Sequence, residues 1–455
     1  MECMNIVAWF SLFFSLFTAL YYFVGMRAGR QTRTENDYFL AGRNLGFWSL
    51  TGTLLATQIG AGVILGTVDD AYAYGLPGLF YGLGIAIGFA VLGMGIAGML
   101  RALNVSTTAE IFEKYFASPA LKKWASLLSI MSLGGIFVAQ VIASRKLMAG
   151  LGVENELLFL GFWAVLIGYT MYGGLPAVVA TDLLQVTCII LVFVCLFIAL
   201  WWQGALSINS FASLWSTHAM PAGGSFQLFF SYVGMPLLFS VVEQDLAQRF
   251  FSARSSLLAT AASWASGFCI VLFALIPAII GVQARLAGVI AVGGQSPLLL
   301  FIAPYVGPIG QALVMCALVA AIASTADSLL CAISSNVVQD FMPTARAVGG
   351  RMRNAEITTA VVGVAGVVGS YYASNILGVM IQSYELLVSS ILVPVLMCIA
   401  GVRLRRTAAL SAVCAGGAVY ALSLMGVCGT FLPGSFLALV ASLMAYGFGL
   451  LISLV

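Results

Sequence analysis

Four oxygen-bearing side chains lie close together in the apolar run AAIASTADSLL. Ser324, Thr325, Asp327 and Ser328 would fall within about one and a half turns of a helix. Oxygen ligands suit hard cations such as Na⁺, and hydroxyls form a weakly charged site that can release its ion. Small hydroxyl residues also mediate packing between membrane helices. The neighbouring carboxylate favours a cation site over packing alone.

Three carboxylates lie within strongly apolar segments: Asp182, Asp327 and Glu385. An ionisable side chain at the centre of a bilayer costs about 2.5–3.5 kcal/mol on insertion scales, so each is a candidate for binding an ion or a solute. Structural roles are the alternatives. Asp182 could lie near the membrane interface, Asp327 could bond to nearby hydroxyls, and Glu385 could pair with a polar neighbour or line a water-filled cavity.

Groups that carry enzyme chemistry are scarce. The chain has one histidine, His218, and its nine cysteines form no CxxC pair. Neither a metal cluster nor a disulfide framework is therefore predicted. No nucleophile, metal set or acid–base constellation is visible, so we expect the protein not to be an enzyme.

The elements that would hold these residues are membrane helices. Hydrophobic residues make up 62% of the 455 and charged residues only 8%, whereas a soluble domain has about 25% charged residues. Each spanning helix needs roughly 20 largely apolar residues, and about thirteen such runs follow one another. They lie near 5–26, 46–72, 76–100, 121–149, 156–173, 177–203, 225–250, 256–283, 306–339, 355–373, 375–401, 407–428 and 432–454. The sequence predicts an all-α polytopic membrane protein with a single transmembrane domain, 1–455.

The placement of basic residues predicts the orientation. Most of the 19 lysines and arginines fall in loops that share one side of the membrane, near 27–43, 101–123, 249–254, 346–353 and 403–406. Positive charge favours the cytoplasmic side. We therefore predict a multi-pass protein of the cell (inner) membrane with its N-terminus outside and its C-terminus in the cytoplasm. Because these basic loops are topology signals, no nucleic-acid partner is predicted, and the oligomeric state is left open.

The predicted helices fall into a leading helix, ten core helices and two trailing helices. The core divides into two sets of five, 46–203 and 225–401. Two sets with an odd number of spans have opposite orientations, as in the inverted repeats of secondary transporters, whose first helices are often interrupted. The residues that would interrupt them here are Gly60, Gly62, Gly66, Gly234 and Pro236. Backbone carbonyls released by such interruptions can bind a cation. The pattern predicts a transporter, and a passive channel is a poor match.

Four runs resemble the sodium:solute symporter family: DYFLAGRNLGFWSLTGTLLATQIGAGVILG, GGLPAVVATDLLQ, EQDLAQRFFSAR and AAIASTADSLL. They occur in order over nearly the whole chain. The resemblance implies a LeuT-type fold with ten core helices in inverted repeats. It also implies sodium-coupled symport of a small organic solute into the cell by alternating access.

The resemblance also implies where sodium would bind. Carried over by position, the family's common site would use the carbonyls of Ala56, Ile59 and Ala321 and the hydroxyls of Ser324 and Thr325. Some members have a second sodium site, which would fall at Asp182, Ser324, Asp327 and Ser328, with an aspartate in place of the usual hydroxyl at 327.

The solute would meet the two broken helices and the third and tenth core helices. The candidate residues are Gln58, Gly60, Val63, Gln140, Ser231, Tyr232, Gln382 and Glu385. Sialic-acid carriers of the family hold the carboxylate with an arginine in the third helix, and the run LLSIMSLGGIFVAQ has none. Sugar carriers have polar residues where this chain has Gly62 and Val63. Choline carriers line their pocket with tryptophans, whereas the matching residue here is Gln58.

The remaining charges favour an amine. Glu385 is acidic, and no buried arginine is predicted apart from the 145–146 pair. An amino acid, or a similar zwitterion or amine, is therefore the preferred solute, and a contact between the solute and Arg145 or Lys146 is left open. Two alternatives are a proton-coupled symporter that uses Asp182 and Asp327, and a solute sensor that works with a separate partner.

Overall fold

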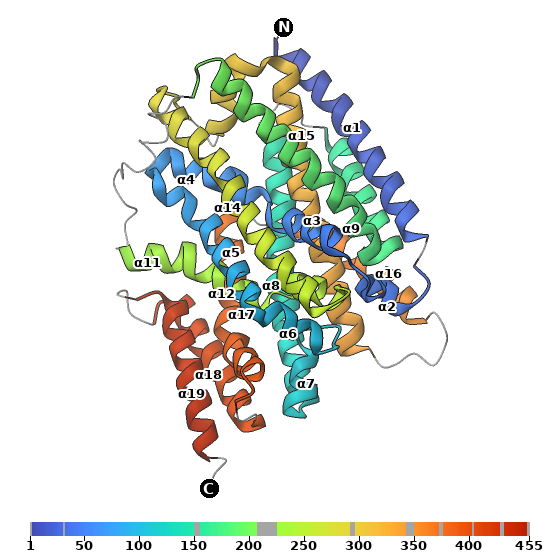
Figure 1. Ribbon diagram of the computed structural model, residues 1–455, viewed down its shortest axis with the longest axis vertical. Coiled ribbons are helices and arrows are strands. Elements are labelled where there is room, and N and C mark those ends of the chain that lie inside the picture. Colours follow the sequence, from blue (N-terminus) through green and yellow to red (C-terminus); the bar gives the residue numbers. More distant parts are fainter. Residues whose placement is uncertain are drawn as a thin grey trace.

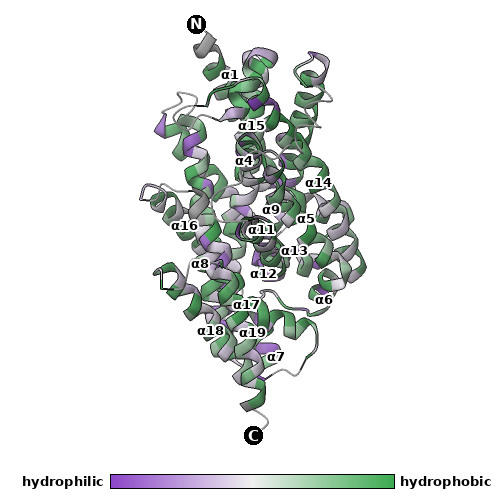
Figure 2. Cartoon of the chain, turned by 90° about the vertical axis from the view of Figure 1, so that its left-hand side faces the viewer, coloured by the Kyte–Doolittle hydropathy of each residue, from purple (hydrophilic) through white to green (hydrophobic). Residues whose placement is uncertain are grey.

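The structure is a computed structural model that describes residues 2–30, 32–149, 155–206, 225–291, 296–342, 350–372, 376–402, 405–427 and 432–452. Within this part of the chain nearly all residues are helical and no strand occurs. The N- and C-termini lie at opposite ends of the molecule (Figure 1). Apolar residues cover most of the helices (Figure 2), as expected for a protein that sits in lipid.

The first part of the chain forms α1 (Glu2–Gly29), α2 (Glu35–Leu40), α3 (Phe47–Gln58), α4 (Thr67–Tyr74), α5 (Phe80–Val91), α6 (Ala97–Ala102), α7 (Glu110–Phe116), α8 (Pro119–Ala149) and α9 (Glu156–Trp202). The second part forms α11 (Ser225–Phe229), α12 (Met235–Val242), α13 (Gln244–Ser252), α14 (Ser256–Leu286), α15 (Pro297–Asn336), α16 (Gly350–Gly369), α17 (Ile376–Ile399), α18 (Arg406–Leu424) and α19 (Gly434–Ile452).

The predicted apolar runs correspond to helices throughout the described chain. By length and composition, nine described helices can cross a membrane, or up to eleven if each bent pair is one span. The multi-pass helical architecture is confirmed. The number of thirteen spans and the division into 46–203 and 225–401 stay predictions.

Helix α9 contains a sharp reversal. Its 47 residues would reach about 70 Å if straight, far more than a bilayer needs. Tyr169 and Thr181, twelve positions apart and hence about 18 Å apart in a straight helix, both donate to the same Asp327 carboxylate oxygen, at 2.7 and 3.4 Å. The chain turns back at Gly174, which has φ 55° and ψ −146°. A side chain there would also come within 2.5 Å of the Tyr38 carbonyl oxygen.

Two bent helix pairs lie at the centre of the fold. Helix α3 and the segment Gly62–Tyr74 meet at 60°, and Phe226–Val242 meets Gln244–Ser252 at 47°. The first break follows Ile59, where the glycines predicted it. The second lies at Glu243, whose extended backbone (φ −62°, ψ 121°) ends α12, and not at Gly234 or Pro236. Pro236 lies in the first turn of α12, where its missing N–H is tolerated.

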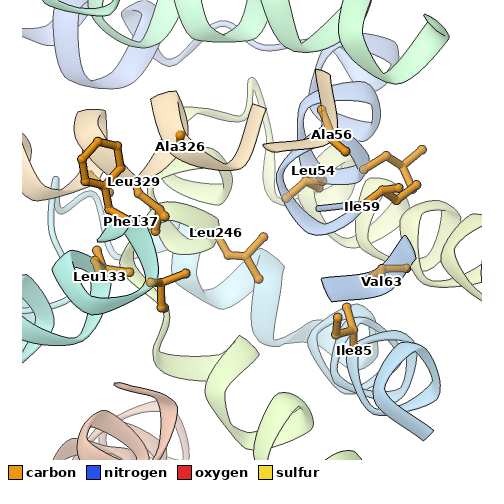
Figure 3. Packing of buried hydrophobic residues seen from close by; sticks show 14 of the residues in the cluster. Leu54, Ala56, Ile59, Val63, Ile85, Leu133, Phe137, Leu246, Ala326 and Leu329 are labelled. Carbon is orange, nitrogen blue, oxygen red and sulfur yellow. The ribbon is translucent and has the colours of Figure 1, made fainter. Parts of the chain in front are cut away.

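Helix α15 passes through the middle of the molecule. Every residue from Val314 to Asn336 is buried. Figure 3 shows apolar side chains of α3, α8, α13 and α15 gathered in this core, among them Ala56, Leu133, Leu246 and Leu329. Helices α18 and α19 pack on each other and on α17. The hydroxyl and carboxyl groups of α15 are thus shielded from lipid and can meet only other helices.

Candidate ion and solute site

Two hydroxyls of α15 lie against the broken end of α3. The Ser324 Oγ is 2.8 Å from the Ala56 carbonyl and 3.1 Å from the Ala321 carbonyl. The Thr325 Oγ1 is 3.0 Å from the Thr57 carbonyl and 3.2 Å from that of Ala321. We call these three carbonyls and two hydroxyls the oxygen cluster. Each hydroxyl has one hydrogen to donate but lies within hydrogen-bond distance of two carbonyls, so the cluster holds more acceptors than hydroxyl hydrogens.

Four of the five sodium ligands predicted from the sequence belong to this cluster. The exception is Ile59, which lies at the break itself (φ −80°, ψ 61°), while the α3 carbonyl nearest to Thr325 is that of Thr57. Gly60 allows the close approach of α3 and α15, because an added Cβ would lie 2.7 Å from the Thr325 Oγ1.

A buried arginine changes the interpretation of the second predicted site. Arg249 of α13 is fully buried and forms an ion pair with Asp182, with 3.1 Å between Nη2 and Oδ2. Its Nη2 also donates to the Ser328 Oγ and its Nε to the Thr53 Oγ1, at 2.5 and 2.8 Å. Two predictions from the sequence are therefore wrong: Arg249 does not belong to a basic loop, and a buried arginine outside the 145–146 pair does exist. A second sodium ion at Asp182 and Ser328 would have to displace this guanidinium.

Asp327 has hydrogen bonds of its own, which do not involve Arg249. Its Oδ2 accepts from Tyr169 and Thr181 of α9, and its Oδ1 is buried without a hydrogen-bond partner among the described residues. Asp327 therefore joins α15 to both halves of α9. Of the four residues predicted for the second site, Asp182 and Ser328 are joined through Arg249. Ser324 belongs to the oxygen cluster, and Asp327 bonds to Tyr169 and Thr181 of α9.

Two adjoining cavities lie beside the oxygen cluster. The central cavity is lined by Gly60, Gly62, Val63, Met380 and the polar residues Thr57, Gln58, Tyr81, Gln140, Glu243, Thr325 and Tyr384, together with Ile136 and Leu329. The vestibule cavity is lined by Gly62, Gly66, Asp70, Tyr81, Ser231, Tyr232, Pro236, Met380, Ile381 and Tyr384. The hydroxyls of Tyr81 and Tyr384, 2.9 Å apart, belong to the linings of both. Thr57, Gly60 and Thr325 connect the central cavity directly to the oxygen cluster.

Six of the eight predicted solute residues line these cavities. Gln58, Gly60, Val63 and Gln140 lie on the central cavity, and Ser231 and Tyr232 lie on the vestibule cavity.

The other two predicted solute residues, Gln382 and Glu385, do not line either cavity. Glu385 accepts hydrogen bonds from Ser435 (2.8 Å) and Tyr420 (3.5 Å), and the Gln382 carbonyl accepts from Tyr420 as well. The structure thus places Glu385 against α18 and α19. Arg145 is also remote from the cavities, because it pairs with Glu156 at 3.0 Å and stacks on the Tyr371 ring at 3.6 Å.

Sequence reasoning missed one acidic residue of the central cavity. Glu243 lies at the second helix break, is 6% exposed, and accepts a hydrogen bond from the Gln58 Nε2 at 3.2 Å. The run EQDLAQRFF carried the signal, because it places two acids and an arginine directly after an apolar helix.

Residues 38–416 match the family model described as the sodium:solute symporter family. The chain belongs to this family. The curated relatives that match are transporters rather than enzymes. A sodium/glucose cotransporter of Vibrio parahaemolyticus is 30% identical over 39% of this chain and 34% of its own length. High-affinity choline transporter 1 of Drosophila melanogaster is 27% identical over 59% of this chain and 44% of its own length. The matched regions thus span less than half of either relative.

A solved structure matches almost the whole chain. A sodium-coupled sialic acid symporter in a substrate-bound, outward-open state has a TM-score of 0.78 at 17% identity and covers 97% of this chain and 96% of its own. At this identity the likeness shows the fold alone. Both the family predicted from the four sequence runs and the LeuT-type all-α fold are confirmed.

Proposed function

We propose that this protein is a secondary active transporter that carries a small organic solute into the cell together with Na⁺. The observation that supports it best is the oxygen cluster, in which two hydroxyls of α15 meet three carbonyls of α3 and α15 and carry fewer hydrogens than there are acceptors. A surplus of uncharged acceptors suits a hard monovalent cation. Membership of a family of sodium symporters supports the same ion.

Coupling between ion and solute would follow because the oxygen cluster and the central cavity have residues in common. A sodium ion at the oxygen cluster would favour the arrangement in which α3 and α15 touch. Thr57, Gly60 and Thr325 also line the central cavity, so the same arrangement shapes the solute site. A ligand shifts such an equilibrium only by its differential affinity for the two arrangements. Sodium and solute must then strengthen each other's binding by the same factor.

The direction of transport rests on the predicted orientation, with the N-terminus outside and the C-terminus in the cytoplasm. In this orientation the vestibule cavity, with Asp70 and Tyr232, opens toward the outside. The central cavity, with Gln58 and Glu243, lies near the helix breaks. Solute would enter through the vestibule and leave toward the cytoplasm after the bundle rearranges.

The preferred solute is an amino acid or a similar zwitterion or amine. Neither Glu385, which bonds to Ser435 of α19, nor a lack of buried arginines supports this preference, because Arg249 is buried. The preference now depends on the charge of the cavities. Their described lining includes two carboxylates, Asp70 and Glu243, and no lysine or arginine.

The sodium proposal can be tested without knowing the solute. We expect NaCl to raise the thermal unfolding midpoint of the purified full-length protein above that in KCl of equal concentration, because an ion that binds only the folded state stabilises it. The double variant Ser324→Ala/Thr325→Ala should lose this difference. Ser334→Ala is a matched control, since Ser334 is also buried in α15 and, among the described residues, its hydroxyl donates to the Cys331 carbonyl of its own helix. An unchanged sodium effect in the double variant would refute the site.

Proton coupling is the main alternative to sodium coupling, because one buried carboxylate oxygen of Asp327 has no hydrogen-bond partner among the described residues. Solute uptake into proteoliposomes separates the two. We expect uptake to follow a sodium gradient at fixed pH. Uptake that is indifferent to sodium and follows a pH gradient would replace sodium with protons as the coupling ion.

A further inference from the structure

We propose that Glu243 is the counter-ion for a positively charged amine on the transported solute. This inference rests on the proposed transport function and extends it, because it names the group that selects the solute. Glu243 ends α12 at the second helix break, in an extended conformation, and its carboxylate lies on the central cavity. The side chain is only 6% exposed, so a cation bound there would be largely shielded from water.

The buried charges around the helix breaks do not balance. Four carboxyl groups, those of Asp182, Glu243, Asp245 and Asp327, are buried there with one guanidinium, that of Arg249. Arg249 forms its ion pair with Asp182, which leaves three carboxyls without a basic partner among the described residues. A buried charge without a partner is strongly unfavourable. Positive charge must therefore be supplied by cations or protons that enter the protein.

Glu243 is the one of these three that an incoming molecule can reach. It is the only carboxylate in the described lining of the central cavity. Asp245 is 1% exposed and Asp327 is fully buried, and neither belongs to the lining of either cavity. A solute cation can thus meet Glu243 directly, while the other two carboxyls are left to ions or protons.

A second side chain of the central cavity, that of Gln140, has an oxygen that can accept a hydrogen bond from a ligand. Gln140 of α8 is 2% exposed, and its Oε1 has no hydrogen-bond partner among the described residues. Leaving a buried amide oxygen unpaired is costly, so this oxygen is suited to accept from an N–H of the solute. The aromatic rings of Tyr81 and Tyr384 also line the cavity, and aromatic faces attract ammonium groups.

The vestibule cavity, which adjoins the central cavity, also has an acidic lining. Asp70 lines the vestibule cavity next to Tyr232, and no described lysine or arginine lines either cavity. Acidic walls in a low-dielectric cleft concentrate cations and repel anions. The site therefore suits a monocationic amine or a zwitterion such as an amino acid, and it disfavours a solute whose only charge is a carboxylate.

The test uses sets of three small molecules of similar shape, of which one carries an amine and a carboxylate, one the carboxylate alone and one the amine alone. The sets are L-alanine, propionate and ethylamine; L-proline, cyclopentanecarboxylate and pyrrolidine; and L-phenylalanine, 3-phenylpropionate and phenethylamine. Each is added in NaCl to the purified full-length protein, and the thermal unfolding midpoint is measured. We expect a member with an amine to raise the midpoint, while the acid without an amine in the same set leaves it unchanged.

Variants assign the selectivity to Glu243. Glu243→Gln should raise the half-saturating amine concentration at least about tenfold, because a charge-assisted hydrogen bond is lost. Glu243→Asp keeps the charge and should retain the preference for amines. Glu385→Gln is the matched control, since this carboxylate faces α18 and α19, and it should behave as the unchanged protein.

Several outcomes would overturn the assignment. They are equal stabilisation by the acid without an amine, no stabilisation by an amine in any set, and an unchanged preference in Glu243→Gln. If Glu243→Gln abolished the rise of the unfolding midpoint that NaCl causes without any solute, Glu243 would be a sodium ligand and not the counter-ion of an amine. The sodium effect measured without any solute stays a separate test, so failure here leaves the proposed sodium coupling standing.

Discussion

At the scale of single residues, Asp182–Arg249 is the one ion pair among the described residues whose two side chains are both fully buried. Both side chains are fully buried, and removing one partner of a buried ion pair leaves an uncompensated charge. We expect Arg249→Met to destabilise the protein by about 3–5 kcal/mol. Thermal unfolding in detergent, followed by tryptophan fluorescence, measures the change.

Two further variants separate charge from packing. Arg249→Met combined with Asp182→Asn should recover part of the loss, because neither member of the pair is then left as a buried charge without its partner. Arg254→Met removes an exposed arginine just after the same helix and should change the stability by less than about 0.5 kcal/mol. An equal loss in the single and double variants would mean that the ion pair itself does not stabilise the fold.

Gly60 governs how closely α3 and α15 approach. Because a Cβ at this position would lie 2.7 Å from the Thr325 Oγ1, Gly60→Ala must push the threonine hydroxyl away from the oxygen cluster. We expect the sodium concentration for half-maximal thermal stabilisation to rise by about tenfold or more, since a displaced ligand costs at least about 1.4 kcal/mol of binding energy. Gly134→Ala on α8 is the control, because nothing lies within 4 Å of its added Cβ. Equal sodium dependence in both variants would contradict the placement of the cluster.

The site could be predicted from sequence as far as residue type and spacing allow. Ser324 and Thr325 stand out as hydroxyls in an apolar helix, and the glycines after Gln58 indicate a broken partner. Arg249 could not be paired with Asp182, because the two lie 67 positions apart and no local pattern connects them. For Glu385 the helix was predicted correctly, but the side of the helix on which the residue lies was not. The residue bonds to α18 and α19 and not to the solute cavities.

At the scale of elements, local chemistry predicted the helices well and their breaks only in part. Apolar runs gave bounds within a few residues for most helices, because the bilayer sets their length. The break at Glu243 was missed. Glycine and proline usually mark such breaks, whereas here Gly234 and Pro236 are absorbed by π-helical turns at Phe230–Gly234 and by the first turn of α12. The break therefore lies between α12 and α13, after the helix that Pro236 begins and not before it.

The reversal in α9 depends on one glycine. Gly174 has a positive φ of 55°, and a Cβ there would lie 2.5 Å from the Tyr38 carbonyl oxygen. We expect Gly174→Ala to destabilise the protein by about 1–3 kcal/mol, as a strained left-handed residue does. Gly161→Ala, earlier in the same helix and with open space around its added Cβ, should be neutral or slightly stabilising. Thermal unfolding midpoints of the two variants give the comparison, and equal midpoints would contradict the reversal.

At the scale of the whole molecule, the fold joins two distant parts of the chain through α15. This helix contacts α1, α3, α8 and α9, and it carries hydroxyls to the oxygen cluster and a carboxylate to α9. Any rearrangement that separates α3 from α15 must therefore break the hydrogen bonds of Ser324 and Thr325. An ion that binds the same groups would therefore stabilise the global conformation in which α3 and α15 are in contact.

The predicted orientation of the molecule in the membrane can be tested by labelling cysteines at the two ends of α14. Arg254 and Ala287 are both exposed, and α14 (Ser256–Leu286) separates them. If positive charge sets the topology, a cysteine at 254 lies in the cytoplasm and one at 287 lies outside. In a cysteine-free background, we expect a membrane-impermeant maleimide to label Ala287→Cys on intact cells and Arg254→Cys only after permeabilisation. Labelling in the reverse order would invert the molecule and turn the vestibule cavity toward the cytoplasm.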